Sequence, residues 1–296
     1  MPRMIPGIPE VTLVNPRADR VKQVRALSGR PARSRHGQFL VEGPQGVREA
    51  VRHAPADVRD VYLTAAAAER YDEIVVAARD AGLFVHVATP EVLAAMSGDA
   101  QGVLAVVRTG AVVTLVDALR AAAAPARPLL VAVLANVRDP GNAGTVIRAS
   151  DAAGADLVVL AGESVDVHNP KVVRSTAGSL FHLPVVTGTS LPDAVAVLRA
   201  AGCVVLAADG GGEHDLDDLL DVAGATSRDV ATPDLAGSTA WVFGNEAWGL
   251  PEQDRALADA VVRVPIRGRA ESLNLATAAT VCLYASGRAQ RAVRAG

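Results

Sequence analysis

The sequence predicts an α/β protein built from two domains. Runs rich in valine and leucine alternate with alanine-rich stretches of helical character, and a stretch of alanine and proline near the middle separates two such series. The chain has 296 residues, of which 50% are hydrophobic and only 3% aromatic. Two domains of ordinary size therefore have enough apolar material, with Ala, Val and Leu filling their cores.

The first series predicts a small α/β domain over residues 37–110. Short apolar runs indicate strands, and the stretches between them indicate helices, as in βαβ units with a mostly parallel sheet. The expected strands are 38–43, 58–64, 83–88 and 102–109, and the expected helices are 45–53, 65–81 and 90–96.

The second series predicts a larger domain over residues 129–296, preceded by a linker over residues 111–128. The linker is placed where Pro125 and Pro128 interrupt an alanine run that has no apolar period. Near-continuous Val/Leu runs then indicate strands buried on both faces of a mostly parallel sheet. The expected strands are 129–137, 157–161, 182–186, 204–208, 240–243 and 261–265.

Charge is distributed unevenly along the chain. The formal net charge is −3, yet residues 1–40 hold eight basic residues against two acids, a local charge of +6. Residues 1–36 are therefore expected to form a basic arm. Local positive charge can hold an RNA backbone, although a merely solvated arm fits the same pattern. Residues 210–238 are acidic and glycine-rich, and they are expected to form a surface loop with room for one short helix.

Cysteine and histidine usage favours a cytoplasmic protein without a metal. Cys203 and Cys282 are isolated, which argues against a disulfide framework and a structural zinc site. The histidines are scattered without a metal-spaced pair, and His86 and His182 fall in expected strands. The start of the chain has no apolar signal-peptide region, and the best apolar run, 129–137, is too short to span a bilayer.

Three segments of the second half place polar residues where strands end. The first, Asn136–Arg148, follows a buried strand with a Gly/Pro turn, and a helix is expected to begin near Asn142 as its N-cap. Its glycines allow backbone N–H groups to approach a ligand. The dinucleotide fingerprint is not met, because only two residues separate Gly141 from Gly144 and no acid ends the next strand.

The other two segments have the same character. Val242–Pro251 runs from a strand into a polar turn with two glycines. Val264–Ala276 runs from a strand through a basic loop into a helix, for which Ser272 is the expected N-cap. Each segment alone fits an ordinary turn followed by a capped helix, so the evidence lies in their combination.

Together and in this order, the three segments resemble the motifs of the SpoU/TrmH branch of the SPOUT methyltransferases. The matching patterns are N-x-x-D-P-G-N-x-G-x-x-x-R, G-N-E-x-x-G-L and V-P-I-x-G-x-x-E-S-L-N-x-A, supported by Asn169–Ser179. The resemblance covers about residues 129–290. The stretch Phe39–Glu49 is similar to the L30e-like substrate-binding domain that precedes the methyltransferase domain in many members.

The resemblance implies a fold and a ligand. The family's catalytic domain is an α/β fold with a deep trefoil knot, a rare threading that composition could not reveal. Its knot loops hold S-adenosylmethionine largely through main-chain contacts, and here they contain Gly244, Ile266 and Leu275. Family members are homodimers with the site near the interface, for which the helix from Leu273 to about Ala289 is the candidate.

The implied reaction is transfer of a methyl group to a ribose 2′-hydroxyl of RNA. Ribosomal RNA is the substrate that we expect first. Transfer RNA and a non-catalytic RNA-binding role are the alternatives. By resemblance Arg148 is the catalytic arginine, either as a base or, as we favour, by holding a phosphate and stabilising the alkoxide, because a guanidinium is hard to deprotonate. The other expected catalytic residues are Asn142, Glu246, Ser272 and Asn274, and the expected RNA contacts are Arg174, Arg267 and Arg269.

Overall fold

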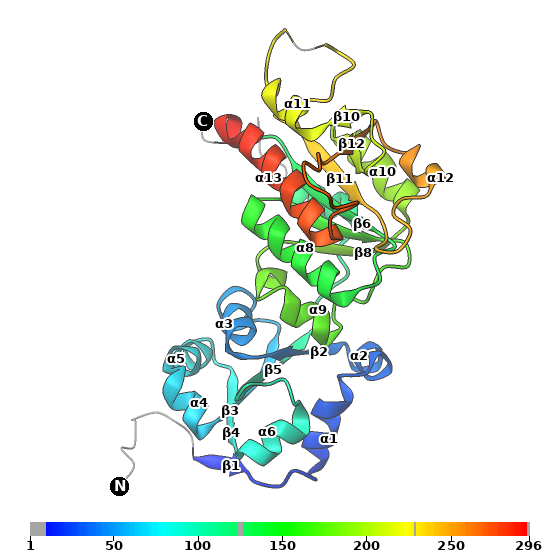
Figure 1. Cartoon of the computed structure of the whole chain (residues 1–296). Helices are drawn as coiled ribbons and strands as arrows, with labels where there is room; N and C mark the ends of the chain where they lie inside the picture. Colours follow the sequence, from blue (N-terminus) through cyan, green and yellow to red (C-terminus); the bar gives the residue numbers. More distant parts are fainter. Residues whose placement is uncertain (1–9, 123–126, 228, 295–296) are drawn as a thin grey trace. The chain divides into compact units, whose positions relative to one another are not determined.

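The computed structural model describes residues 10–122, 127–227 and 229–294, without the side chains of residues 292–294. The chain divides into two compact units (Figure 1). The first runs to Ala111 and also contains Asp166–His182, and the second comprises Val112–Val165 and the chain from Leu183 onward. The predicted α/β fold class with a separate N-terminal domain is confirmed.

The first unit contains a five-stranded mixed sheet in the order β1-β4-β3-β5-β2. Its parallel pairs are β1/β4 and β3/β4, whereas β5 is antiparallel to both β3 and β2. The strands are β1 (Val11–Leu13), β2 (Gln38–Glu42), β3 (Val58–Thr64), β4 (Phe84–Ala88) and β5 (Val103–Arg108).

The expectation of a mostly parallel sheet in this unit is wrong at β5. Ala88, at the end of β4, lies beside Thr64, and Val103, at the start of β5, lies beside Leu63. The chain therefore enters β5 at the end of the sheet where it leaves β4. The intervening helix α6 (Pro90–Met96) spans only about 10 Å, so it does not return the chain to the opposite end.

Helices cover both faces of this sheet. One core lies beneath α3, α4 and α5, and the other lies beneath α1 and α6. The expected helix 65–81 is two helices that meet at Tyr71, which has a non-helical backbone. The helices of this unit are α1 (Asp19–Ala26), α2 (Arg30–His36), α3 (Pro44–His53), α4 (Ala65–Arg70), α5 (Asp72–Asp80), α6, α9 (Pro170–Ser175) and the 3₁₀ helix η1 (Ser179–Phe181).

The segment expected to be a basic arm is folded over its described part, residues 10–36. It contains β1, α1 and α2, and Val21, Val24 and Leu27 are buried in the core with α6. The arginines of α1 lie between these apolar positions, so the helix is amphipathic and its basic residues occupy the outer face. Residues 1–9 of the expected arm lie outside the described residues.

The second unit contains a seven-stranded sheet in the order β10-β12-β9-β11-β6-β7-β8, in which every pairing is parallel. All residues of β6, β7 and β11 are buried, as predicted for strands covered on both faces. The strands are β6 (Leu130–Ala135), β7 (Leu157–Ala161), β8 (Val185–Thr189), β9 (Val204–Ala208), β10 (His214–Asp215), β11 (Thr239–Phe243) and β12 (Ala260–Arg263).

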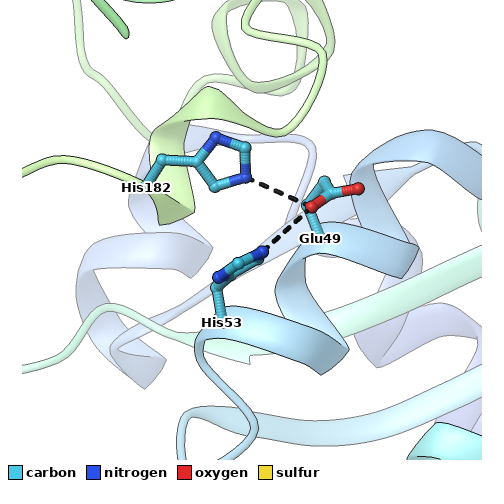
Figure 2. A group of neighbouring side chains, drawn as sticks. All are labelled: Glu49, His53 and His182. Carbon is cyan, nitrogen blue, oxygen red and sulfur yellow. Dashed lines mark hydrogen bonds and ion pairs between the residues drawn. The ribbon is translucent and has the colours of Figure 1, made fainter. Parts of the chain in front are cut away.

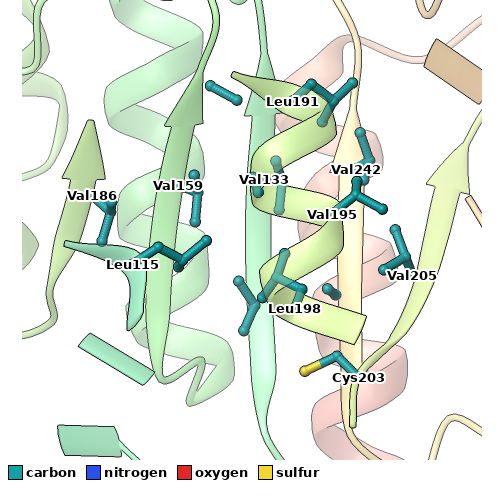
Figure 3. Close-up of a cluster of buried hydrophobic side chains, with 14 of the residues drawn as sticks. Leu115, Val133, Val159, Val186, Leu191, Val195, Leu198, Cys203, Val205 and Val242 are labelled. Carbon is teal, nitrogen blue, oxygen red and sulfur yellow. The ribbon is translucent and has the colours of Figure 1, made fainter. Parts of the chain in front are cut away.

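Two helix layers enclose this sheet. Residues of α7 and α10 pack with Val133, Val159 and Val242 in one core (Figure 3). On the other face α8 and α13 pack against each other, and Trp241 Nε1 donates to Ser286 Oγ of α13 at 2.9 Å. The helices are α7 (Leu115–Ala122), α8 (Pro140–Ala153), α10 (Leu191–Ala200), α11 (Leu216–Asp221), α12 (Glu252–Arg255) and α13 (Leu275–Arg294).

Two further expectations differ from the structure. The expected linker 111–128 contains α7, whose Leu115, Ala118 and Leu119 are buried, while residues 123–126 lie outside the described residues. The strand expected at 182–186 is β8, which begins at Val185; His182 instead ends η1 in the first unit. Among the described residues, no helix is both long and apolar enough to cross a membrane.

Candidate active site

The turn after β6 is held by Asn136. Its backbone is left-handed, with φ of 56°, a conformation that asparagine tolerates better than most residues. Its Oδ1 accepts from Glu163 N at 2.9 Å, and its carbonyl accepts from Asn245 Nδ2 at 2.8 Å. Asn245, which follows β11, is buried, so its amide joins the turns after β6 and β11.

Helix α8 begins one turn earlier than expected, at Pro140. Asp139 is its N-cap and accepts from Asn142 N at 2.7 Å, so the expected cap at Asn142 is wrong. Proline at the first helical position is pre-organised for a helix start, and Asp is among the preferred caps. Asn142 therefore lies in the first turn, where its side chain is available for other contacts.

Glu246 lies against the start of α8. Its Oε1 accepts from Asp139 N at 3.1 Å and from Asn142 Nδ2 at 3.4 Å, and its Oε2 accepts from Arg138 N at 3.3 Å. A carboxylate at a helix N-terminus is stabilised by these backbone donors and by the helix dipole. The loop after β11 is thereby fixed to α8.

Asn274 completes a network of three side chains. Its Nδ2 donates to Asn142 Oδ1 at 3.1 Å, and its Oδ1 accepts from Ala276 N at 2.9 Å. Asn274 is thus the residue that caps α13, and the expected cap at Ser272 is wrong. The structure brings Glu246, Asn142 and Asn274 together from three segments that are far apart in the sequence.

A cavity of about 530 Å³ adjoins this network within the second unit. It lies among the loops that follow β9, β11 and β12 and the start of α13. The expected cofactor residues Gly244, Ile266 and Leu275 all line it, as do Glu246, Ser272 and Asn274. Its volume falls in the usual range for small-molecule sites, about 300–1,000 Å³.

The wall of this cavity at Gly244 is main chain. A Cβ atom at Gly244 would lie 2.3 Å from the carbonyl carbon of Gly249, so only glycine fits. Asn245 and Gly249 exchange backbone hydrogen bonds of 3.0 and 2.9 Å across this turn. The cavity combines this main-chain wall with apolar Ile266 and Leu275 and with the carboxylate of Asp209. These groups fit a nucleoside that carries a cationic amino-acid tail, as S-adenosylmethionine does.

Arg148 does not line the cavity. It lies on α8, six residues after Asn142, which places it roughly 9 Å farther along the helix and on a different side. Its side chain is exposed, and among the described residues no hydrogen bond or ion pair joins it to another side chain. Within a single chain, Arg148 therefore lies apart from the network of Asn142, Glu246 and Asn274.

The three expected RNA contacts lie in different surroundings. Arg174, in the first unit, is 31% exposed and forms ion pairs with Glu42 and, at 3.0 Å, with Asp99. Arg267 pairs with Asp217 of α11, whereas Arg269 is exposed. Arg174 and Arg267 thus already have carboxylate partners, which offset part of their positive charge.

Two residues of the site were missed in the sequence. Asp139 precedes a proline, and the preference of helices for proline at their first position identifies such a residue as the cap. Asn245 lies within the second motif, but nothing in the sequence indicates that its amide is buried and donates to Asn136, which is 109 residues away.

The parallel sheet and the loop-bound cavity define a class of α/β enzyme that holds a nucleoside-like ligand beyond the carboxyl ends of its strands. Comparison with known proteins identifies the family. Residues 129–284 match the SpoU rRNA Methylase family, and residues 18–105 match the MRM3-like substrate binding domain. The chain belongs to the SpoU rRNA methylase family.

Characterised relatives support this assignment. The chain is 31% identical over 271 residues to the 23S rRNA (guanosine(2553)-2′-O)-methyltransferase RlmP of Bacillus subtilis, covering 90% of this chain and 94% of that protein. It is 41% identical over 148 residues to the 23S rRNA (uridine(2479)-2′-O)-methyltransferase of Streptomyces viridochromogenes, covering 49% of this chain and 47% of that protein.

Solved structures agree with the fold. The SpoU methyltransferase AviRb from Streptomyces viridochromogenes, in complex with the cofactor AdoMet, has a TM-score of 0.72 and 33% identity over 93% of this chain and 99% of that chain. An AdoMet-bound rRNA methyltransferase from Sinorhizobium meliloti has a TM-score of 0.71 and 29% identity over 91% and 94%.

Proposed function

We propose that this protein methylates a ribose 2′-hydroxyl of 23S ribosomal RNA with S-adenosylmethionine as the methyl donor. The observation that carries the proposal is the cavity in which Gly244, Ile266 and Leu275 meet beside the polar network of Glu246, Asn142 and Asn274. Relatives that span most of the chain are named for 2′-O-methylation of 23S rRNA. For this substrate we also propose a cytoplasmic location.

The roles of the polar residues follow from their contacts. S-adenosylmethionine, when bound, supplies an electrophilic methyl group. Glu246 accepts from Asn142, and Asn142 accepts from Asn274, so the orientation of both amides is fixed before RNA arrives. Fixed dipoles at a reacting centre cost no reorganisation during the reaction. We assign these three residues to positioning the ribose, and Ser272, which lines the same cavity, to contact with substrate or donor.

We further propose that the enzyme acts as a homodimer paired through α8 and α13. These helices lie side by side on one face of the sheet (Figure 1). Away from the sheet, α13 exposes the apolar side chains of Val281 and Tyr284, 39% and 51% exposed, and α8 exposes Arg148. In a dimer of this kind Arg148 would serve the site of the partner subunit, which explains why it stands apart from the network in its own chain.

For Arg148 we propose an electrostatic role. Its guanidinium would hold the phosphate next to the target ribose and stabilise the developing alkoxide, because arginine stays protonated in proteins. The alternative role, removal of the hydroxyl proton by a neutral arginine, predicts that Arg148→Lys keeps substantial activity with a new ionisation in its pH–rate profile. The electrostatic role predicts a large loss of activity and no such new ionisation.

Methyl transfer to separate RNA pools tests the proposed function. Purified protein is incubated with methyl-labelled S-adenosylmethionine and either 23S rRNA or total tRNA. Label is expected in 23S rRNA only, with a loss of at least about 100-fold in Arg148→Ala, as for removal of a transition-state donor. Arg120→Ala, an exposed arginine of α7, should retain full activity. Label in tRNA alone would reject the rRNA assignment, and absence of donor binding would reject the methyltransferase.

A further inference from the structure

Three potential metal ligands converge in the first unit, away from the cavity described above. Glu49 and His53 lie one turn apart on α3, and His182 ends η1 (Figure 2). Glu49 Oε2 lies 3.2 Å from His53 Nε2 and 3.2 Å from His182 Nε2. The three ligand atoms all lie within 4.8 Å of one another.

The backbone around Gly178 makes this approach possible. Gly178 has φ of 102°, and a Cβ atom there would lie 2.5 Å from Glu49 Cγ. A residue with a side chain would therefore push the 178–182 segment away from α3. Because glycine occupies this position, η1 packs against α3 and His182 is held over Glu49, which is 133 residues earlier in the chain.

The donor set is one that zinc prefers. Two imidazole nitrogens and one carboxylate oxygen form a known three-ligand zinc set, with a fourth position left for water. Atoms bound at about 2.0–2.1 Å around a tetrahedral zinc lie roughly 3.3 Å apart, close to both Glu49–His separations. The side chains of His53, Glu49 and His182 are 50%, 19% and 28% exposed, so an ion can reach them from solvent.

We propose that Glu49, His53 and His182 bind one Zn²⁺ ion per chain. The ion would join α3 to Asp166–His182, a segment that lies in the sequence within the methyltransferase match but folds with the first unit. The three ligands come together only in the folded chain, so the ion binds the folded state and adds to its stability. The ion acts here as a structural clip, independent of methyl transfer.

Zinc titration of the full-length, untagged protein tests this site. After treatment with a chelator, the protein is titrated with Zn²⁺ in competition with a chromophoric indicator. We expect one tight equivalent, and at least about a tenfold loss of affinity in each of His53→Ala, His182→Ala and Glu49→Gln, since each removes one of three ligands. His36→Ala, an exposed histidine of α2, is the matched control and should bind as the wild type does.

Two further readouts separate a zinc site from a simple ion-pair network. Co²⁺ should give the intense visible absorption of a four-coordinate site, and Zn²⁺ should raise the Tm of the wild type by more than that of the variants. His53→Ala changes an exposed side chain and should fold normally, as checked by circular dichroism. The proposal is overturned if the wild type and His53→Ala bind Zn²⁺ equally, or if Zn²⁺ leaves the wild-type Tm unchanged.

Discussion

At the scale of single residues, the shape of the site depends on positions where only one type of residue fits. Gly244 is the clearest of them. The backbone of Gly249 lies so close that a Cβ atom added at Gly244 would be only 2.3 Å from it. Gly162 is another, since an added Cβ there would lie 2.4 Å from Oδ1 of Asn136, whose own backbone is left-handed. The cavity is thus shaped by close backbone contacts.

Gly244→Ala should abolish donor binding. The added methyl group overlaps the Gly249 carbonyl, so the loop must move and the cavity wall is displaced. Isothermal titration with S-adenosylmethionine would measure the loss. Gly98→Ala, in the first unit, is the control, because a Cβ there meets nothing within 4 Å and donor binding should be unchanged. Normal donor affinity in Gly244→Ala would contradict the assignment of this wall to the donor site.

The two cysteines should be inert in the folded protein. Burial raises the pKa of Cys203 to about 11 and the pKa of Cys282 above its ordinary range. As pH rises from 9 through 11, the unfolded chain loses these protons first, so alkaline pH lowers the free energy of unfolding. A thiol reagent should find no reactive cysteine at pH 8 and two in denaturant. Fast reaction of the native protein would contradict this burial.

Sequence patterns revealed the motifs but only part of their geometry. Asn142, Glu246 and Asn274 were expected in one site, and the structure places them in hydrogen-bond contact. The partners of Arg174 could not be foreseen, because Glu42 is 132 residues away and belongs to a different motif. The proposed zinc ligands were not predicted as a group for the same reason: Glu49 and His53 lie one turn apart on a helix, but His182 is brought to them only by the tertiary fold.

At the scale of elements, buried strands were the easiest to predict. Valine- and leucine-rich runs identified β6, β7 and β9, and the apolar run Ala240–Phe243 identified β11, because strands covered on both faces contain mostly apolar residues. The described part of the expected arm contains β1, α1 and α2, and the expected linker contains α7. Their short amphipathic patterns are obscured by arginine in α1 and by alanine in α7. The trefoil knot expected from the resemblance stays a prediction.

The segment Asp166–His182 should depend on a nearly buried ion pair. Arg33 is 5% exposed and its Nη2 donates to Asp166 Oδ2 at 2.7 Å. Burial alone would raise the pKa of Asp166, but hydrogen bonds from Arg33 and from the backbone of His168 leave it below its ordinary value of 3.8. This contribution to stability is present above pH 3.8 and is lost as pH falls through the lowered pKa.

Arg33→Ala should therefore lower the free energy of unfolding by about 3 kcal/mol, the cost of leaving one partner of a buried pair alone. Denaturant unfolding near neutral pH would measure this change. The exposed pair Lys22–Asp19 supplies the control, because Lys22→Ala should change stability by less than about 1 kcal/mol. Equal small effects of both substitutions would show that Arg33 does not hold this segment.

The exposed face of α13 should form the contact between two copies. Tyr284→Glu places a charge in the apolar patch with Val281 and should convert the dimer to a monomer. Light scattering after size-exclusion chromatography measures the mass, and methyl transfer should fall with it. Val76→Glu, on an exposed valine of α5, is the control and should stay dimeric. A monomeric wild type would contradict the proposed pairing.

At the scale of the whole molecule, the two units have different features. The second unit carries the parallel sheet, the cavity and the polar network, and the first matches a substrate-binding domain. The net charge of −3 gave no indication of an RNA enzyme, because nucleic acid is held by local positive charge. Family motifs identified the reaction. The boundary between the units was not predictable in the same way, because Asp166–His182 folds with the first unit and no local sequence feature reveals this.

The most direct test of the central claim is the chemical identity of the methylated nucleoside. Labelled 23S rRNA from the transfer reaction is digested to nucleosides and separated by chromatography. The account predicts that the label lies in a 2′-O-methylated nucleoside and that the adjacent phosphodiester resists alkali. Label in a methylated base, with the donor bound normally, would contradict it.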